Sequence, residues 1–156
     1  MALPAGAAEA RQGVFKARGA NGAVTAAKGP NGGTAVRARG KTTNADGSVT
    51  TGSAAAVRAP NGARAVRGST TTANPDGSLT HEGGLAAEGA KGSVASTGAV
   101  SRSADGTWSG GRSTSATSAS TGNSYQGSVS IDPATGQPTH SATCYDAAGT
   151  VIACPR

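Results

Sequence analysis

The chain has very few large apolar side chains. Leu, Ile, Val and Phe together account for only 16 of its 156 residues, whereas a globular domain of this length buries most of the surface of its unfolded chain. A conventional core is therefore excluded, which leaves disorder or strands that pack through small residues. Only 14% of the residues are charged, and the excess lies in Ala, Gly, Ser and Thr. This composition favours ordered strands, because Thr suits a pleated surface and Gly and Ala allow close approach.

Long apolar runs and clustered catalytic residues are also missing. No stretch approaches the roughly 20 apolar residues of a membrane helix, so we expect no membrane span. His81 and His140 lie far apart in the sequence, and neither has a nucleophile or metal ligand at a known motif spacing. Each turn supplies one Asp at most, whereas Ca²⁺ takes about six to eight oxygen ligands. We expect no enzymatic activity, no cofactor and no metal site.

What the sequence does have is a turn that repeats with one chemistry. Pro or Ala, then Asn, Asp or Lys, then Gly recur at steps of 15, 15, 15, 15 and 14 residues. Gly in the fourth place, preceded by Asn or Asp, is typical of a type I turn closed by a G1 bulge. The glycines in that place are Gly32, Gly47, Gly62, Gly77, Gly92 and Gly106.

The segments between the turns contain about eleven residues rich in Thr, Val, Ala and Ser. Three-residue loops at each turn would align Thr42, Thr50, Thr72 and Thr80 in one row, and place Gly84 beside Gly98. The sequence therefore predicts an all-β fold, a repetitive antiparallel meander with a period of about 15 residues that is open-ended and assembling. A β-solenoid with rungs of about 30 residues would produce the same rows and stays an alternative.

The period divides the chain into three parts. Residues 20–112 form the regular array, and residues 113–156 form a less regular C-terminal cap, since repeat arrays commonly have atypical ends. Residues 1–19 precede the array and contain Val14 and Phe15. This segment is either a flexible leader or a donor strand that pairs with the edge of a neighbouring subunit.

The chain has two cysteines, Cys144 and Cys154, which flank a turn-like segment. They face each other if Asp146 pairs with Ile152 across a five-residue loop, and a disulfide would then staple the last hairpin. Two free buried thiols are the alternative. A disulfide implies an oxidising compartment, so we expect the protein to be secreted, extracellular or at the cell surface.

Charge is distributed unevenly along the sequence. Residues 1–67 contain ten Lys or Arg and two acids, whereas residues 68–156 contain four Lys or Arg and six acids. The candidate contact residues are Arg37, Arg39, Lys41, Arg58, Arg64 and Arg67. They could bind a polyanion such as an anionic polysaccharide or extracellular DNA, or the acidic side of a next subunit near Glu82 and Glu88, or form a solvated edge that opposes aggregation.

In kind, residues 19–150 resemble the secreted Gly-, Ala- and Thr-rich repeat subunits of bacterial extracellular fibres, curli-like functional amyloids among them. The resemblance rests on strand–turn repetition with small residues in aligned rows, and the chain departs from curli in lacking regular Gln and Asn ladders. It implies a structural subunit that pairs with itself through strand edges into an extracellular or cell-surface fibre of the biofilm-matrix type. The alternative is a monomeric β-array that binds a polysaccharide, a polyanion or ice through a flat face.

Overall fold

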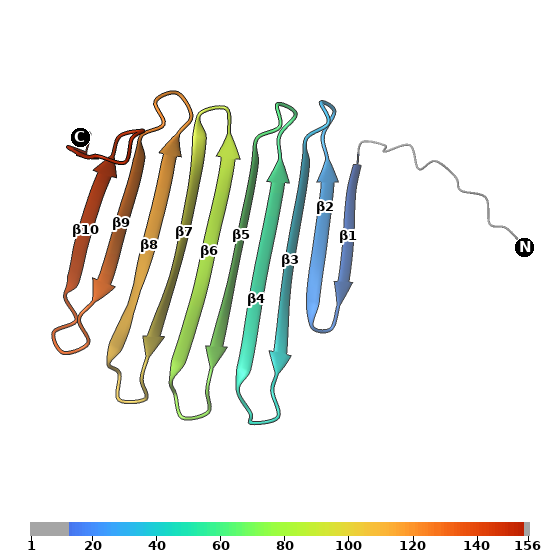
Figure 1. Cartoon of the computed structure of the whole chain (residues 1–156). Coiled ribbons are helices and arrows are strands. Elements are labelled where there is room, and N and C mark those ends of the chain that lie inside the picture. Colours follow the sequence, from blue (N-terminus) through green and yellow to red (C-terminus); the bar gives the residue numbers. More distant parts are fainter. Residues whose placement is uncertain (1–12, 155–156) are drawn as a thin grey trace, which may run out of the picture.

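The computed structural model describes residues 13–154 as one sheet of eleven antiparallel strands (Figure 1). Each strand pairs with its neighbours in sequence, so the predicted open meander is confirmed and the solenoid alternative is wrong. The strands are β1 (Gly13–Gly19), β2 (Gly22–Lys28), β3 (Thr34–Thr43), β4 (Val49–Arg58), β5 (Arg64–Ala73), β6 (Leu79–Gly89), β7 (Gly92–Arg102), β8 (Trp108–Ser118), β9 (Ser124–Ile131), β10 (Pro138–Tyr145) and β11 (Val151–Ile152).

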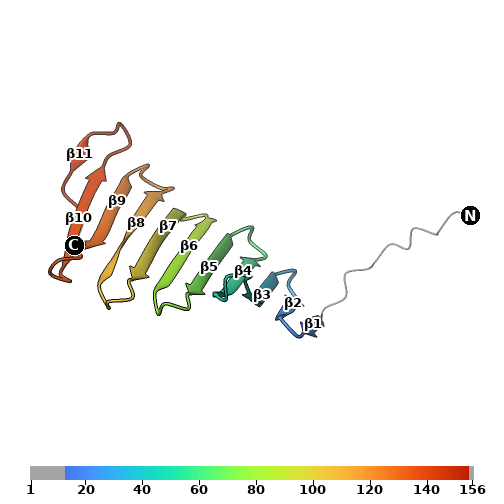
Figure 2. The same ribbon diagram turned by 90° about the horizontal axis from the view of Figure 1, so that it is seen from below.

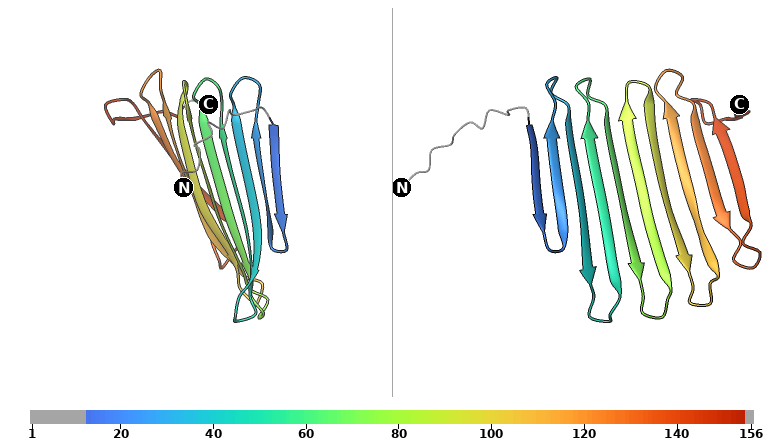
Figure 3. Two further views of the ribbon diagram at one scale, coloured as in Figure 1. Left: turned by 90° about the vertical axis from the view of Figure 1, so that its right-hand side faces the viewer. Right: turned by 180° about the vertical axis from the view of Figure 1, so that it is seen from behind.

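The sheet is a single layer, and in the described part of the chain nothing packs against either face (Figures 2 and 3). Cys144 is the one buried hydrophobic residue there, at 5% exposure. The accessible surface is 10972 Å², against roughly 7,000 Å² for a folded monomer of this mass. Strand pairing, and not a core, therefore holds the protein together.

The turns fix the register locally, and the turn that follows β3 shows how. The N–H of Asn44 donates to the carbonyl of Ser48 at 2.8 Å, and the N–H of Gly47 donates to the carbonyl of Asn44 at 3.0 Å. Asp46 accepts from the N–H of Ser48 at 2.9 Å. Gly47 has φ 82°, a conformation that costs other residues about 1–2 kcal/mol. Similar positive φ values, from 82° to 90°, occur at Gly32, Gly62, Gly77 and Gly106.

Because the turns set the pairing, like residues meet across strands. Thr42 pairs with Thr50, Thr50 with Thr72, and Thr72 with Thr80, as the sequence predicts. The hydroxyls of Thr50 and Thr72 are 3.0 Å apart and hydrogen-bonded. Such cross-strand pairs contribute roughly 0.2–1 kcal/mol each.

The hairpin of β6 and β7 departs from the expected pattern. Gly89 pairs with Gly92 across a two-residue loop, and Gly92 has φ 135° instead of the value near 85°. Lys91 stands where the regular turns have Asn or Asp, and its ammonium cannot accept the N–H that Asp46 accepts. The three-residue loop is therefore not stabilised by this hydrogen bond at Lys91. Since the register shifts by one residue, Gly98 pairs with Gly83 instead of Gly84, and β7 turns its side chains to the opposite faces from those expected.

Candidate functional site

Unpaired strand backbone lies along the two edges of the sheet. β1 forms one edge, and β10 forms the other except where β11 pairs with Cys144 and Tyr145 (Figure 1). Unpaired N–H and C=O groups on such edges are templates for pairing with another chain. Both edges are therefore candidate sites of association.

Backbone hydrogen bonding alternates along each strand, which identifies the outward groups of β1. The N–H of Lys41 donates to the carbonyl of Asn21, so odd-numbered residues of β2 bond to β3 and even-numbered ones bond to β1. The partners of the even-numbered residues include Ala17, opposite Val24. The outward backbone groups of β1 consequently belong to its remaining residues, Val14, Lys16 and Arg18.

The same reasoning applies to β10. The N–H of Asp132 donates to the carbonyl of Gln137, so residues 139, 141 and 143 bond inward to β9. The outward groups belong to Pro138, His140 and Ala142, with Cys144 bonding to β11. Pro138 has no N–H to offer, and its position on an outward site of an edge strand agrees with the usual placement of proline in sheets.

The two faces of the sheet differ sharply in charge. Side chains alternate between faces along a strand, and cross-strand partners share a face. One face, here called the basic face, carries eight cations and, within the described strands, no carboxylate: Lys16, Arg18, Arg37, Arg39, Lys41, Arg67, Arg102 and Arg112. The other, the threonine face, carries the row Thr42, Thr50, Thr72 and Thr80 with Lys28, Arg58, Arg64, Glu82 and Glu88.

Two of the eight cations on the basic face are bound to their own sheet. Arg102 donates to the carbonyl of Gly77 at 2.9 Å, and Arg112 donates to the hydroxyl of Ser96 at 2.9 Å. The other six lie on β1, β3 and β5, and their charged side-chain groups make no hydrogen bond or ion pair with a residue in the range 13–154: Lys16, Arg18, Arg37, Arg39, Lys41 and Arg67. This group of six is called the cation grid below.

Five of the six residues of the cation grid line two adjoining hollows on the basic face, and Arg67 lines neither. One, of about 490 Å³, is lined by residues that include Arg18, Arg39, Lys41, Ser53 and Ser69. The other, of about 110 Å³, lies among Lys16, Arg18, Arg37 and Arg39. The hollows exist because small residues occupy the positions between the cations. The hollows are therefore lined by cationic groups and hydroxyl groups.

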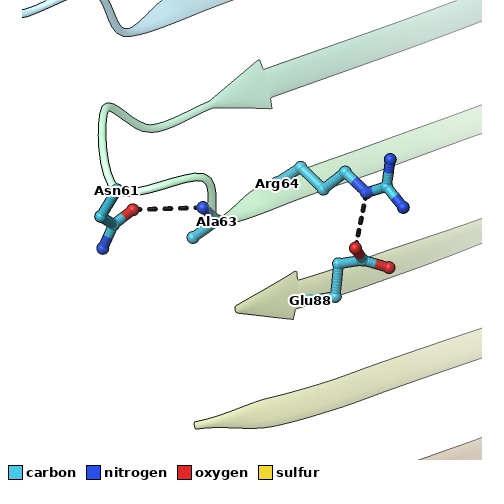
Figure 4. Close-up of polar contacts among 4 residues, drawn as sticks. All are labelled: Asn61, Ala63, Arg64 and Glu88. Carbon is cyan, nitrogen blue, oxygen red and sulfur yellow. Dashed lines mark hydrogen bonds and ion pairs between the residues drawn. The ribbon is translucent and has the colours of Figure 1, made fainter. Parts of the chain in front are cut away.

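The remaining two candidate arginines have a different surrounding. Arg58 pairs with Arg64 on the threonine face, and Arg64 pairs in turn with Glu88. The Nε of Arg64 lies 2.8 Å from a carboxylate oxygen of Glu88, beside the turn in which Asn61 accepts from the N–H of Ala63 at 3.2 Å (Figure 4). Arg64 is therefore already paired within the chain. The structure divides the six predicted contact residues between two faces.

Val14 and Phe15 lie in β1, opposite Ala27 and Ala26 of β2, and both are exposed, at 64% and 63%. Within the chain, β1 is thus the edge strand of its own sheet. The first twelve residues of the predicted leader lie outside the described residues. Pairing of β1 with a neighbouring subunit stays a prediction.

The turn aspartates accept hydrogen bonds within their own turns. Asp46 accepts from the hydroxyl and the N–H of Ser48, which lowers the pKa of its carboxyl below the usual 3.8. The pKa values of Asp76, Asp105 and Asp132 are lowered for the same kind of reason, mainly by backbone N–H donors two residues on. Within residues 13–154, no three His, Cys, Asp or Glu side chains lie close enough together to hold a metal ion.

The disulfide between Cys144 and Cys154 is present, with Cα atoms 5.2 Å apart. Its hairpin differs from the expected one, because the N–H of Asp146 donates to the carbonyl of Thr150 across a three-residue loop. Cys144 therefore pairs with Ile152, and Cys154 follows β11 and bonds back to β10. Disulfides are typical of proteins from oxidising compartments.

Sequence reasoning did not group Lys16 and Arg18 with the other cations, because it assigned them to a leader. The signal was present: Gly19 and Gly22 bracket a two-residue loop, Ala20-Asn21, that returns β1 onto β2. Counting back from this loop places Lys16 and Arg18 on the face of Arg37 and Arg39.

No protein family model, curated protein or solved structure matches the chain. Across residues 13–154, no helix is long and apolar enough to span a membrane.

Proposed function

We propose that the chain is a structural subunit of a self-assembling extracellular or cell-surface fibre, in which β10 of one copy pairs with β1 of the next. The observation that carries the proposal is the single-layer sheet with two unpaired edges. The sheet runs through ten long strands, β1 to β10, from one edge to the other, and β11 covers only two residues of the second edge.

The even number of long strands makes the two edges compatible. β1 and β10 run in opposite directions, so a copy added by translation continues the antiparallel alternation (Figure 1). The outward groups also match, because Lys16 and His140 both have outward backbone groups and both belong to the basic face. Residues that form a hydrogen-bonded antiparallel pair must share a face. An odd number of strands would meet neither condition.

This matching defines a register. His140 would lie opposite Lys16, with Ala142 opposite Val14 and Pro138 opposite Arg18. The contact is head to tail, and such a contact does not close on itself, so it produces open filaments. Assembly would also extend a sheet that has no core of its own and gains stability from pairing.

The extracellular part of the proposal is supported by the disulfide between Cys144 and Cys154. Such bonds persist in oxidising compartments and are rare in the cytosol. The scarcity of large hydrophobic residues also suits a subunit that must stay soluble before it assembles.

Proline variants of the edges test the proposal. Lys16→Pro removes an outward N–H of β1, and His140→Pro removes one of β10, while both leave the inward ladder bonds in place. We expect the unaltered protein to form micrometre-scale fibres in negative-stain micrographs and each proline variant to remain as discrete particles. Because each variant keeps one intact edge, a substoichiometric addition of either should shorten the fibres of the unaltered protein.

The matched controls are Lys16→Ala and His140→Ala, which remove the same side chains but keep the N–H groups. They should polymerise like the unaltered protein, and far-UV circular dichroism should show the same strand content in all four variants. Discrete particles of the unaltered protein at all concentrations, or equal polymerisation of the proline and alanine variants, would contradict edge pairing.

A further inference from the structure

We propose that the basic face over β1–β5 binds an acidic polysaccharide through the cation grid. The sequence suggested a basic half of the chain, but it did not reveal that six cations without partners share one face while the strand carboxylates lie on the other. The partner's chemistry follows from the spacing, the hollows and the surrounding side chains of the grid.

The spacing of the grid suits a regular, extended polymer. Lys16, Arg37 and Arg67 lie in one row across the sheet, with Thr25 and Ala55 between them. They occupy every second strand, at intervals of about 10 Å. Along β3 the cations alternate with small residues, at intervals of about 7 Å. A polysaccharide with carboxylate or sulfate groups on its successive units can place these groups against successive rows or columns.

The hollows provide the hydrogen-bonding groups that sugars need. The larger one is lined by Arg18 and Arg39 and by Ser53 and Ser69, whose hydroxyls are 3.0 Å from each other. Guanidinium groups bind carboxylates and sulfates with two parallel hydrogen bonds. Hydroxyl groups both donate and accept, as the hydroxyls of a sugar do.

A nucleic acid fits the grid less well. Proteins that hold single strands combine cations with aromatic side chains on which bases stack. Within the described part of β1–β5, Phe15 is the only aromatic residue, and it lies on the threonine face. Trp108 and Tyr125 share the basic face but belong to β8 and β9, beyond the grid.

The cations of the unbound grid repel one another and lower the stability of the sheet, and a bound polyanion would remove this repulsion. Like charges on one face of a sheet destabilise it, and the grid places six positive charges on three strands, β1, β3 and β5. The nearest strand carboxylates, Glu82 and Glu88, lie on the opposite face. A ligand that binds only the folded sheet raises its stability by mass action. Binding should therefore raise the melting temperature of the protein.

The test measures binding of polygalacturonate and dextran sulfate to the full chain by calorimetry at low ionic strength. We expect both polymers to bind, the affinity to fall steeply with salt, and neutral dextran not to bind. Arg37→Gln together with Arg39→Gln should lower the affinity roughly tenfold, as expected for two partly exposed ion pairs. The same double variant should keep or raise the melting temperature of the free protein, which separates lost contacts from misfolding.

The matched control is Arg58→Gln together with Lys91→Gln, which removes the same charge away from the basic face. It should change the affinity less than twofold, since only the long-range field is altered. Equal weakening by both pairs of substitutions would mean that net charge, and not the grid, attracts the polymer. The absence of polymer binding, or tighter binding of a duplex or single-stranded DNA of equal charge, would also overturn the proposal.

This inference does not depend on the proposed fibre. The binding measurements can be made on the Lys16→Ala/His140→Pro variant, which is expected to stay monomeric and keeps five of the six cations. If that variant binds polygalacturonate while the unaltered protein forms no fibres, polysaccharide binding by the grid is supported and edge pairing is contradicted. If fibres form but no anionic polymer binds, edge pairing is supported and polysaccharide binding by the grid is contradicted.

Discussion

The regular strands β3–β6 and the later strands β7–β11 hold the same sheet together by different means. From β3 to β6, every hairpin has a three-residue loop with a left-handed glycine, and neighbouring strands pair over ten residues. From β7 onward, the loops vary in length, Tyr125 leans over Gly127, and a disulfide ties the chain behind β11 to β10. Where the turn chemistry weakens, close side-chain contacts and a covalent bond take over.

Adding a methyl group at Gly92 tests how tightly the irregular β6–β7 hairpin is packed. A Cβ there would meet the carbonyl of Thr117, and φ 135° is a conformation that side chains rarely adopt. Gly92→Ala should therefore lower the free energy of unfolding by about 3 kcal/mol, from overpacking and backbone strain together. Urea denaturation followed by circular dichroism measures the change. A loss below about 1 kcal/mol would mean that the β6–β7 hairpin can relax into the regular three-residue loop.

Removal of the disulfide tests whether the C-terminal strands depend on it. The bond closes a loop with a sequence separation of 10, for which chain entropy predicts about 2–3 kcal/mol. In the Cys144→Ser/Cys154→Ser variant, the amides of β10 and β11 should lose this much protection against hydrogen exchange. Those of β3–β6 should not change, because their register comes from their own turns. A uniform loss of protection across the sheet would contradict a local role.

A regular turn should respond to alanine more weakly than Gly92. Gly77 has φ 85°, and no atom lies within 4 Å of the place a Cβ would take, so Gly77→Ala is opposed by the backbone conformation alone. We expect a loss of about 1–2 kcal/mol in the free energy of unfolding.

Gly68→Ala is the matched control for that loss. Gly68 lies within β5, and a Cβ there would make only an ordinary contact of 3.7 Å with the carbonyl of Ser53. Alanine should be neutral or stabilise the strand by up to about 1 kcal/mol, since it has less freedom to lose on folding. Equal destabilisation by both substitutions would show that the turn conformation is not what limits stability.

The same contrast explains how far the sequence predicts this molecule. The meander and the threonine row follow from turns such as Asn44–Ser48, in which the residues that specify the turn lie beside each other in the chain. The register of β7 could not be predicted by period alone, because Lys91 keeps the spacing while lacking the acceptor. The cation grid was only partly predicted, since it requires both the face of each residue and the loop at Ala20-Asn21, which brings β1 into the sheet.

The smallest effect we predict distinguishes the Asp-bearing turns from the Asn-bearing ones. The folded-state pKa of Asp76 is lowered by the N–H and hydroxyl of Ser78, so its charged form is favoured by folding. The resulting stability is fully present above the usual pKa of 3.8 and is lost as pH falls through the lowered pKa. Asn61, in the corresponding place of its turn, accepts from Ala63 without titrating.

Replacing Asp76 by Asn and Asn61 by Asp separates the effect of the titrating carboxylate from the effect of the hydrogen bond. Asp76→Asn keeps an acceptor oxygen, so the urea midpoint should fall less than that of the unaltered protein between pH 5 and pH 2. Asn61→Asp should steepen the same acid dependence, because it introduces a carboxylate that accepts from the backbone. At pH 6 both variants should lie close to the unaltered protein. If the acid slopes do not change in opposite directions, the lowered pKa values are not coupled to folding, and the two kinds of turn differ only in charge.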